Sequence, residues 1–273
     1  MTLHQVVLVD KTKAIDPALL QNAAAALSLQ ASKHLPGCWS GTTATVSYAS
    51  NAKVLPPNSW PIYLVKALPP GEGGFHQDKR KQPYAEVIAS PDDPTWTIDA
   101  SHEMCEMLVD PYGNRMQSSQ AIAIEGDGVA DTTGEFSYLV EVCDPCEANQ
   151  FAYEINGIAV SDFITPDFYD TTGAAGVSYS YTGSVTRPRD LLKGGYISYI
   201  DESGDWQQIL WVDPNQPPQY NALSALNESL SWREAIHAAM GDGPLKLKRE
   251  RRSDEKMRVH VASRVREFMD RLK

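Results

Sequence analysis

The sequence predicts an α+β fold, in which a mixed β-sheet carries an N-terminal helix and a second helix near residue 100, followed by a smaller, irregular C-terminal region. Two observations predict it. The first 110 residues place short β-rich runs and helical patterns in the order strand, helix, three strands, helix. Beyond that point apolar runs are short and turn dipeptides are frequent, so only a few strands and turns are expected. With 273 residues, 42% of them hydrophobic, the chain can bury a substantial core.

The first 90 residues contain four predicted strands and one helix. His4 to Val9 is a short β-rich run, and Asp16 with Pro17 forms the N-cap and first turn of an alanine- and leucine-rich helix. This helix is expected to end before Pro36. The glycine- and charge-rich stretch 69–83 is predicted to be an exposed loop. Further strands are predicted at residues 42–48, 61–67 and 84–89.

The second helix is predicted from Pro94 to Val109, because its apolar residues can share sides of a helix. Pro111 to Asn114 ends it, since proline cannot continue the hydrogen-bond ladder. Farther along, Asn156-Gly157 favours a hairpin turn between short apolar runs. The remaining predictions are a loop at 173–186 and helices at 221–240 and 253–273, the last with one apolar stripe and a basic stretch, 246–252, before it.

Composition narrows the classes of function. The formal net charge of -11 opposes binding to nucleic acid, because most of the surface would repel a polyphosphate. No apolar run is long enough to span a bilayer, and the first residues lack the pattern of a secretion signal, so no membrane contact is expected and the compartment stays open. Cys143 and Cys146 form a single C-x-x-C, which is more typical of free or once-paired thiols than of a structural zinc site.

Residues 101–106, Ser-His-Glu-Met-Cys-Glu, combine metal-ligand chemistry with helical spacing. On a helix His102 and Glu106 share one face, as the two histidines do in H-E-x-x-H, so both can reach one ion. Glu103 is offset on the helix, where a carboxylate can take a proton from a water molecule that attacks a carbonyl. The pattern alone also occurs by chance in surface helices. The mostly apolar surroundings favour a site, because buried charges need partners or a metal.

The segment SHEMCEMLVDP, residues 101–111, resembles the S-H-E-x-x-E-x-x-x-D-P signature of zincin-like metallopeptidases, most of them uncharacterised bacterial or phage proteins. GFHQDKRKQPYAEVIA before it is similar to a Gly-aromatic-His loop and edge strand of these proteins, and EVCDPCE and INGIAVSDFITPDFYD after it are similar to their acidic segment and its sequel. The resemblance covers residues 64–170. It implies a metal-bound zincin-like fold; one zinc ion and amide hydrolysis are the expectations that we add to it.

Catalytic zinc keeps three protein ligands, so a third must come from elsewhere in the chain. Glu141 is the preferred candidate, with Asp144 and Asp110 as alternatives. Glu141 and Asp144 are three residues apart, so on a helix one can bind the metal while the other orients a ligand. Two carboxylates and one imidazole would neutralise zinc, which leaves manganese or calcium open as other divalent ions.

His76 is the second catalytic candidate. It follows Gly73, Gly74 and Phe75 beside the strand predicted to line the cleft, where it can donate to a tetrahedral intermediate or reach the metal, although an exposed loop histidine is the more ordinary outcome. The acidic cluster at 125–131 has a faint likeness to a calcium loop, but it is too short and lacks the closing glutamate, so an ordinary turn is expected.

The hypothesis that follows is a zinc-dependent peptidase-like hydrolase in which His102, Glu106 and Glu141 hold one ion, Glu103 and His76 act in catalysis, and a peptide or protein substrate pairs with the strand at 84–89. Two alternatives remain: a catalytically inactive zincin-like domain for binding or assembly, and a protein partner bound through the C-terminal helix. The expected organisation is a zincin-like domain at 1–170, a loop and strand extension completing it at 171–220, and a C-terminal helical region at 221–273.

Overall fold

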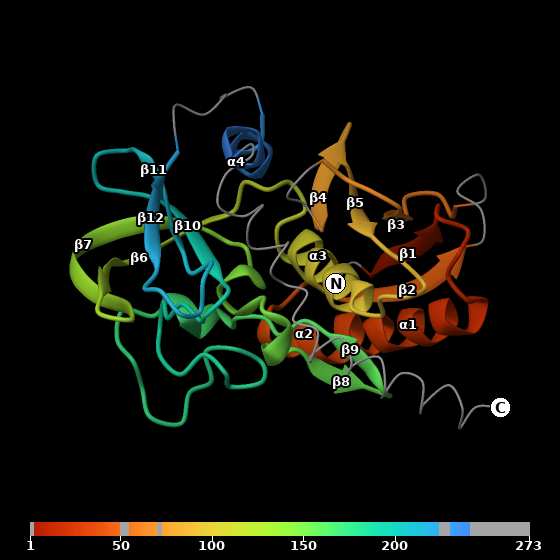
Figure 1. Cartoon of the computed structure of the whole chain (residues 1–273), viewed down its shortest axis with the longest axis horizontal. Coiled ribbons are helices and arrows are strands. Elements are labelled where there is room, and N and C mark those ends of the chain that lie inside the picture. The colour runs from red at the N-terminus through yellow and green to blue at the C-terminus, as the bar shows by residue number, and fades with distance from the viewer. Residues whose placement is uncertain (1–2, 50–54, 70–72, 224–229, 241–273) are drawn as a thin grey trace.

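The computed structural model describes residues 3–49, 55–69, 73–223 and 230–240, and they form two five-stranded sheets with helices between and beside them (Figure 1). The α+β class predicted from the sequence is confirmed. Within the described residues no helix is long and apolar enough to cross a membrane. The expected helix at 253–273 and the basic stretch before it lie outside the described residues.

The first sheet is mixed, as predicted, with the strand order β2-β1-β3-β5-β4. Neighbours among β1, β2, β3 and β5 pair in parallel, and β4 pairs antiparallel with β5 at the edge. The strands are β1 His4–Asp10, β2 Ala44–Ala49, β3 Trp60–Val65, β4 Gly74–Lys79 and β5 Gln82–Ile88.

Strand β4 corrects two predictions. The stretch 69–83, expected to be an exposed loop, contains a strand in which Gly74 and His76 are buried while Phe75 and Gln77 are partly exposed. This alternation is that of a half-buried strand, and it is hidden in the sequence by glycine and charge. Strand β5 is consequently not an edge strand. Both of its sides already pair with neighbours, so no peptide can pair with it.

Helices α1 and α3 cover the same face of the first sheet, where inward-pointing residues of β1, β3 and β5 join them in one apolar cluster. Helix α1, Pro17–Leu29, begins at the predicted cap, since Asp16 accepts hydrogen bonds from Ala18 and Leu19. The chain then continues as a π-helical turn, Gln30–His34, and a short helix α2, Leu35–Cys38. The predicted stop before Pro36 is therefore wrong, because Pro36 lies in the first turn of α2, where no N–H is needed.

Helix α3, Trp96–Val109, forms as predicted, and all of its residues except Asp99 are buried. It packs against β4 and β5 on one side and against β9 on the other. Strands β8, Tyr153–Ile155, and β9, Ile158–Val160, form the predicted hairpin, whose turn residues Asn156 and Gly157 both have positive φ.

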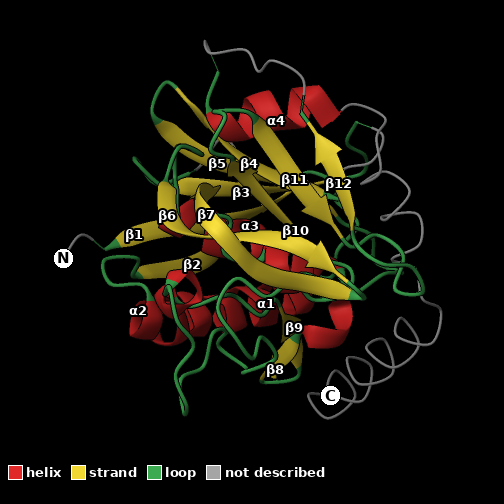
Figure 2. Cartoon of the chain, turned by 90° about the vertical axis from the view of Figure 1, so that its left-hand side faces the viewer, coloured by secondary structure: helices red, strands yellow, loops and turns green. Residues whose placement is uncertain are grey.

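The region after α3 is more regular than predicted. A second, antiparallel sheet has the order β12-β11-β10-β7-β6 and faces the viewer in Figure 2. Strands β7 and β10 pair with each other, so residues 171–220 complete a sheet that begins before residue 170. Its strands are β6 Met116–Glu125, β7 Gly128–Leu139, β10 Tyr196–Ile200, β11 Trp206–Leu210 and β12 Gln219–Ala222.

Helix α4, Trp232–Met240, follows the second sheet and packs on it. Ile236 joins a small apolar cluster with Leu139, Trp206 and Leu223, and Trp232 packs against it. The predicted helix at 221–240 is too long, because Asn221 belongs to β12. Ser231 and Glu234 define the start of α4: the Glu234 carboxylate accepts from the Ser231 N–H, and the Ser231 hydroxyl accepts from the Glu234 N–H, which is a capping box.

Candidate metal centre

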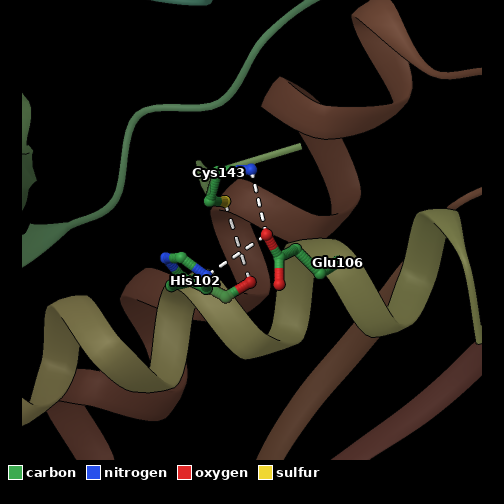
Figure 3. Close-up of side chains that lie close together, drawn as sticks. All are labelled: His102, Glu106 and Cys143. Atoms are coloured by element: carbon green, nitrogen blue, oxygen red, sulfur yellow. Dashed lines mark hydrogen bonds and ion pairs between the residues drawn. The ribbon is translucent and has the colours of Figure 1, made fainter. Parts of the chain in front are cut away.

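Helix α3 brings His102, Glu103 and Glu106 together in the interior, with exposed fractions of 7%, 2% and 0%. His102 and Glu106 lie on one face of the helix, as the spacing predicts, and His102 Nε2 is 3.2 Å from Glu106 Oε1 (Figure 3). The backbone N–H of Cys143 donates to the same Glu106 oxygen at 3.2 Å. Glu106 Oε1 is thereby held toward the histidine.

The segment after β7 supplies two further carboxylates. Glu141 lies in the stretch between β7 and a 3-10 turn, Asp144–Cys146, so Glu141 and Asp144 do not share a helix as expected. Asp144 Oδ1 is 3.2 Å from His102 Nε2, and neither oxygen of Asp144 has a hydrogen-bond partner among the described residues. Asp110 lies at the end of α3, where its Oδ2 accepts from the Arg115 N–H. Of the three candidates for a third ligand, Asp144 is the one that faces His102.

His76 lies in strand β4 with an exposed fraction of 0%, and it points toward α3 rather than into solvent. Its Nε2 is 3.1 Å from the Asp110 carbonyl oxygen, which can only accept, so Nε2 is the donor. Its Nδ1 is 3.5 Å from Glu103 Oε2 and 3.8 Å from Glu106 Oε2. The structure therefore brings His76 to the same cluster as the three residues of α3.

Arg233 is the cluster residue that the sequence does not reveal. It lies in the first turn of α4, is 4% exposed, and inserts its guanidinium among the carboxylates. Nη2 is 3.3 Å from Glu103 Oε2, and Nη1 is 3.0 Å from Glu106 Oε2 and donates also to Glu141 Oε2. The capping box locates the start of α4 in the sequence, but no local pattern shows that the second residue of α4 reaches α3.

Helix α4 is anchored to the turn that ends α3. The Arg233 N–H donates to the Gly113 carbonyl at 3.1 Å, and the Trp232 N–H donates to the Asn114 side chain at 3.0 Å. A Cβ on Gly113 would lie 2.7 Å from Arg233 Cβ, and Gly113 has a φ of +60°. Only glycine fits here without displacing Arg233.

The buried charges shift one another's pKa. Burial would lower the pKa of His102, but the carboxylates of Glu106 and Asp144 raise it well above its usual value. Burial would raise the pKa of Glu106 and of Glu103, whereas their neighbours lower both: mainly His102 and Arg233 for Glu106, and the contact with His76 together with the charge of Arg233 for Glu103. Burial raises the pKa of Glu141 and of Asp144, and their cationic neighbours do not fully offset it.

Gly74 in β4 permits the close approach of α3. A Cβ at this position would lie 2.9 Å from Glu103 Oε1 and 3.0 Å from Glu103 Cγ. We expect Gly74→Ala to lower the free energy of unfolding by about 1–3 kcal/mol, because the added methyl group overpacks a buried contact. Urea unfolding measures this. Gly128→Ala is the control, since nothing lies within 4 Å of a Cβ at that position, and equal losses in both variants would contradict the contact.

The acidic stretch 125–131 lies apart from this cluster, whereas Cys143 lies beside it. Residues 125–131 form the β6–β7 turn and the start of β7, and Asp131 pairs with the buried Arg189 at 2.9 Å, so the cluster is structural. Cys143 and Cys146 are buried free thiols. The Cys143 Sγ lies 3.7 Å from the His102 carbonyl oxygen, beside the cluster (Figure 3).

Comparisons with known proteins add no assignment. No family model, no curated protein and no solved structure matches this chain. Inference about its function therefore depends on the geometry of the cluster.

Proposed function

We propose that this protein is a metal-dependent hydrolase of the zincin-like peptidase type, in which His102, Glu106 and Asp144 hold one divalent ion, zinc by preference, and Glu103 is the general base. The observation that carries the proposal is that one nitrogen, His102 Nε2, contacts a carboxylate oxygen of both Glu106 and Asp144. His102 Nε2 is 3.2 Å from Glu106 Oε1 and 3.2 Å from Asp144 Oδ1. Zinc bonds of 2.0–2.2 Å place tetrahedral ligands about 3.3–3.5 Å apart.

The chemistry of the donors supports an ion at this position. Asp144 is 2% exposed, and its oxygens lack hydrogen-bond partners in the described part of the chain. Among the described residues its one ion pair is the contact with His102, and a buried carboxylate whose oxygens make no hydrogen bond is costly. A divalent cation bound by both side chains would offset that cost. Three buried carboxylates, those of Glu103, Glu106 and Glu141, contact one guanidinium, and Asp144 is a fourth buried carboxylate within reach of Glu106 and Glu141. Glu141, the third ligand predicted from the sequence, lies within reach of Glu106 and Asp144 and stays a possible fourth ligand.

The chain's own residues supply the remaining chemistry. A divalent ion at this position would polarise a substrate carbonyl and lower the pKa of a water molecule. Glu103 would accept the proton of that water molecule, since it directly follows the ligand His102 on α3 and its side chain is offset from the face that His102 and Glu106 share. Arg233 Nη2, 3.3 Å from Glu103 Oε2, would keep that carboxylate oriented, and His76, whose ring is fixed by the Nε2 contact to the Asp110 carbonyl, lies beside it with Nδ1 3.5 Å from the same oxygen.

His102→Ala is expected to remove the ion, because the imidazole is the nitrogen ligand of the set and it contacts both partner ligands. Elemental analysis of protein purified without chelator measures the change. Wild type should carry about one equivalent of zinc and the variant almost none. His4→Ala, which removes a partly exposed histidine whose ring lies tilted against Trp60 in the first sheet, is the control and should keep the ion. Equal and negligible metal in wild type and His102→Ala would contradict the site.

A second candidate function is a catalytically inactive zincin-like domain that serves in binding or assembly. The observation that favours it is the contact between Arg233 and Glu103, which occupies the proposed base with a cation from the same chain. Such a domain would bind the ion without cleaving peptides. Metal content and peptide cleavage, measured on the same preparation, distinguish the two functions.

A further inference from the structure

We infer that the cluster contains a second divalent-cation position, built from His76, Glu103 and Glu106, which the Arg233 guanidinium fills. The inference goes beyond the proposed function and uses it only for the first ion. The two positions would share Glu106, with Oε1 directed to His102 and Oε2 directed to His76 and Arg233.

The donor atoms of the second position converge. His76 Nδ1, Glu103 and Glu106 each offer a ligand atom within 4.8 Å of the others, and all three residues are buried. A nitrogen and two carboxylate oxygens suit zinc or manganese. Glu141 Oε2 accepts from the same guanidinium, so a third carboxylate oxygen lies at this position.

His76 is an independent sign of a ligand. It is fully buried, and its Nδ1 is aimed at Glu103 and Glu106 but has no hydrogen-bond partner in the described ranges. Its other nitrogen already contacts the Asp110 carbonyl, which fixes the ring in this orientation. A histidine whose second nitrogen is oriented by a backbone carbonyl is the arrangement found at metal ligands.

Arg233 shows that the position accepts a cation. Its two terminal nitrogens contact Glu103 Oε2 and Glu106 Oε2, the oxygens nearest to His76 Nδ1. The guanidinium arrives on α4, whose start is fixed by its capping box and by hydrogen bonds to Gly113 and Asn114. Docking of α4 therefore keeps the centre at one ion, and displacement of Arg233 makes room for a second ion that shares Glu106 with the first.

The test is the stoichiometry of zinc and of manganese in wild type and in Arg233→Ala, measured by calorimetric titration and elemental analysis of the metal-stripped full chain. Wild type should bind one ion and the variant two. Arg233→Lys, which retains a cation at this position, is the matched control and should bind one. Electron paramagnetic resonance of the manganese-loaded variant should show a spin-coupled pair, because two ions that share a carboxylate lie about 3.5–4 Å apart.

A second variant covers the case in which Arg233→Ala does not fold. Gly113→Ala keeps the arginine but places a Cβ 2.7 Å from Arg233 Cβ, which displaces it from the cluster, and it should also bind two ions. One ion in wild type and in both variants would overturn the second position, and so would a second ion that is not spin-coupled to the first. No ion in wild type and one in Arg233→Ala would support the position while contradicting the proposed function. No ion in any of them would overturn both.

Discussion

Arg233→Ala is expected to lower the free energy of unfolding of the metal-free protein by about 3–5 kcal/mol, the usual cost of removing one partner from a buried ion pair. The reason is that three carboxylates depend on this guanidinium. Glu103, Glu106 and Glu141 are 2%, 0% and 6% exposed, and Arg233 contacts all three. Without it their negative charges are buried beside one another. Urea unfolding with a chelator present measures the loss.

Two comparisons separate this electrostatic effect from lost packing. Arg187→Ala removes an arginine whose side chain is 39% exposed and paired with Asp190. This variant should lower the free energy of unfolding by no more than about 1 kcal/mol. Adding Glu141→Gln to Arg233→Ala should recover part of the lost free energy of unfolding, because an amide carries no charge into the cluster. A double-mutant cycle gives the interaction energy between the two residues. A loss in Arg233→Ala no greater than in Arg187→Ala would show that the guanidinium does not stabilise the carboxylates.

The part of the candidate metal centre that lies on one helix could be predicted from the sequence. Helix α3 follows from its apolar residues and from Pro111, and its spacing alone places His102, Glu103 and Glu106 side by side. A helix fixes relative positions within a few residues through its 3.6-residue period. The part of the site that lies on α3 can therefore be predicted from the sequence.

The rest of the centre depends on contacts between distant segments. Strand β4 exists because it pairs with β5 and packs on α3, and neither interaction shows in its glycine- and charge-rich sequence. This is why His76 was expected on an exposed loop. Arg233 reaches Glu106 across 127 positions of the chain, so no spacing rule connects them. The spacing of Glu141 and Asp144 predicts a pair on one helix. In the structure strand β7 ends just before Glu141 and a 3-10 turn begins at Asp144, and this turn directs the Asp144 side chain to His102.

Glu103→Gln is expected to lower the turnover of peptide cleavage by about 10²–10⁴-fold, the usual contribution of a positioned general base. The amide keeps the shape of the side chain but cannot accept a proton. Metal content should not change, because the proposed ligands are His102, Glu106 and Asp144, and the contacts of His102 with the other two do not involve Glu103. Digestion of a mixed peptide library, read by mass spectrometry, measures cleavage, and elemental analysis of the same samples measures the ion.

The matched control is Glu86→Gln, which neutralises a glutamate on β5 that pairs with Lys11 at the surface, and it should retain the wild-type rate. Because burial would raise the pKa of Glu103 while His76 and Arg233 lower it, the carboxylate is held in its ionised form, which a base requires. Cleavage that survives in Glu103→Gln would assign the base to another residue. A wild-type protein that holds one ion and cleaves nothing would instead favour the binding or assembly function, in which Arg233 permanently occupies the carboxylate that would otherwise act as the base.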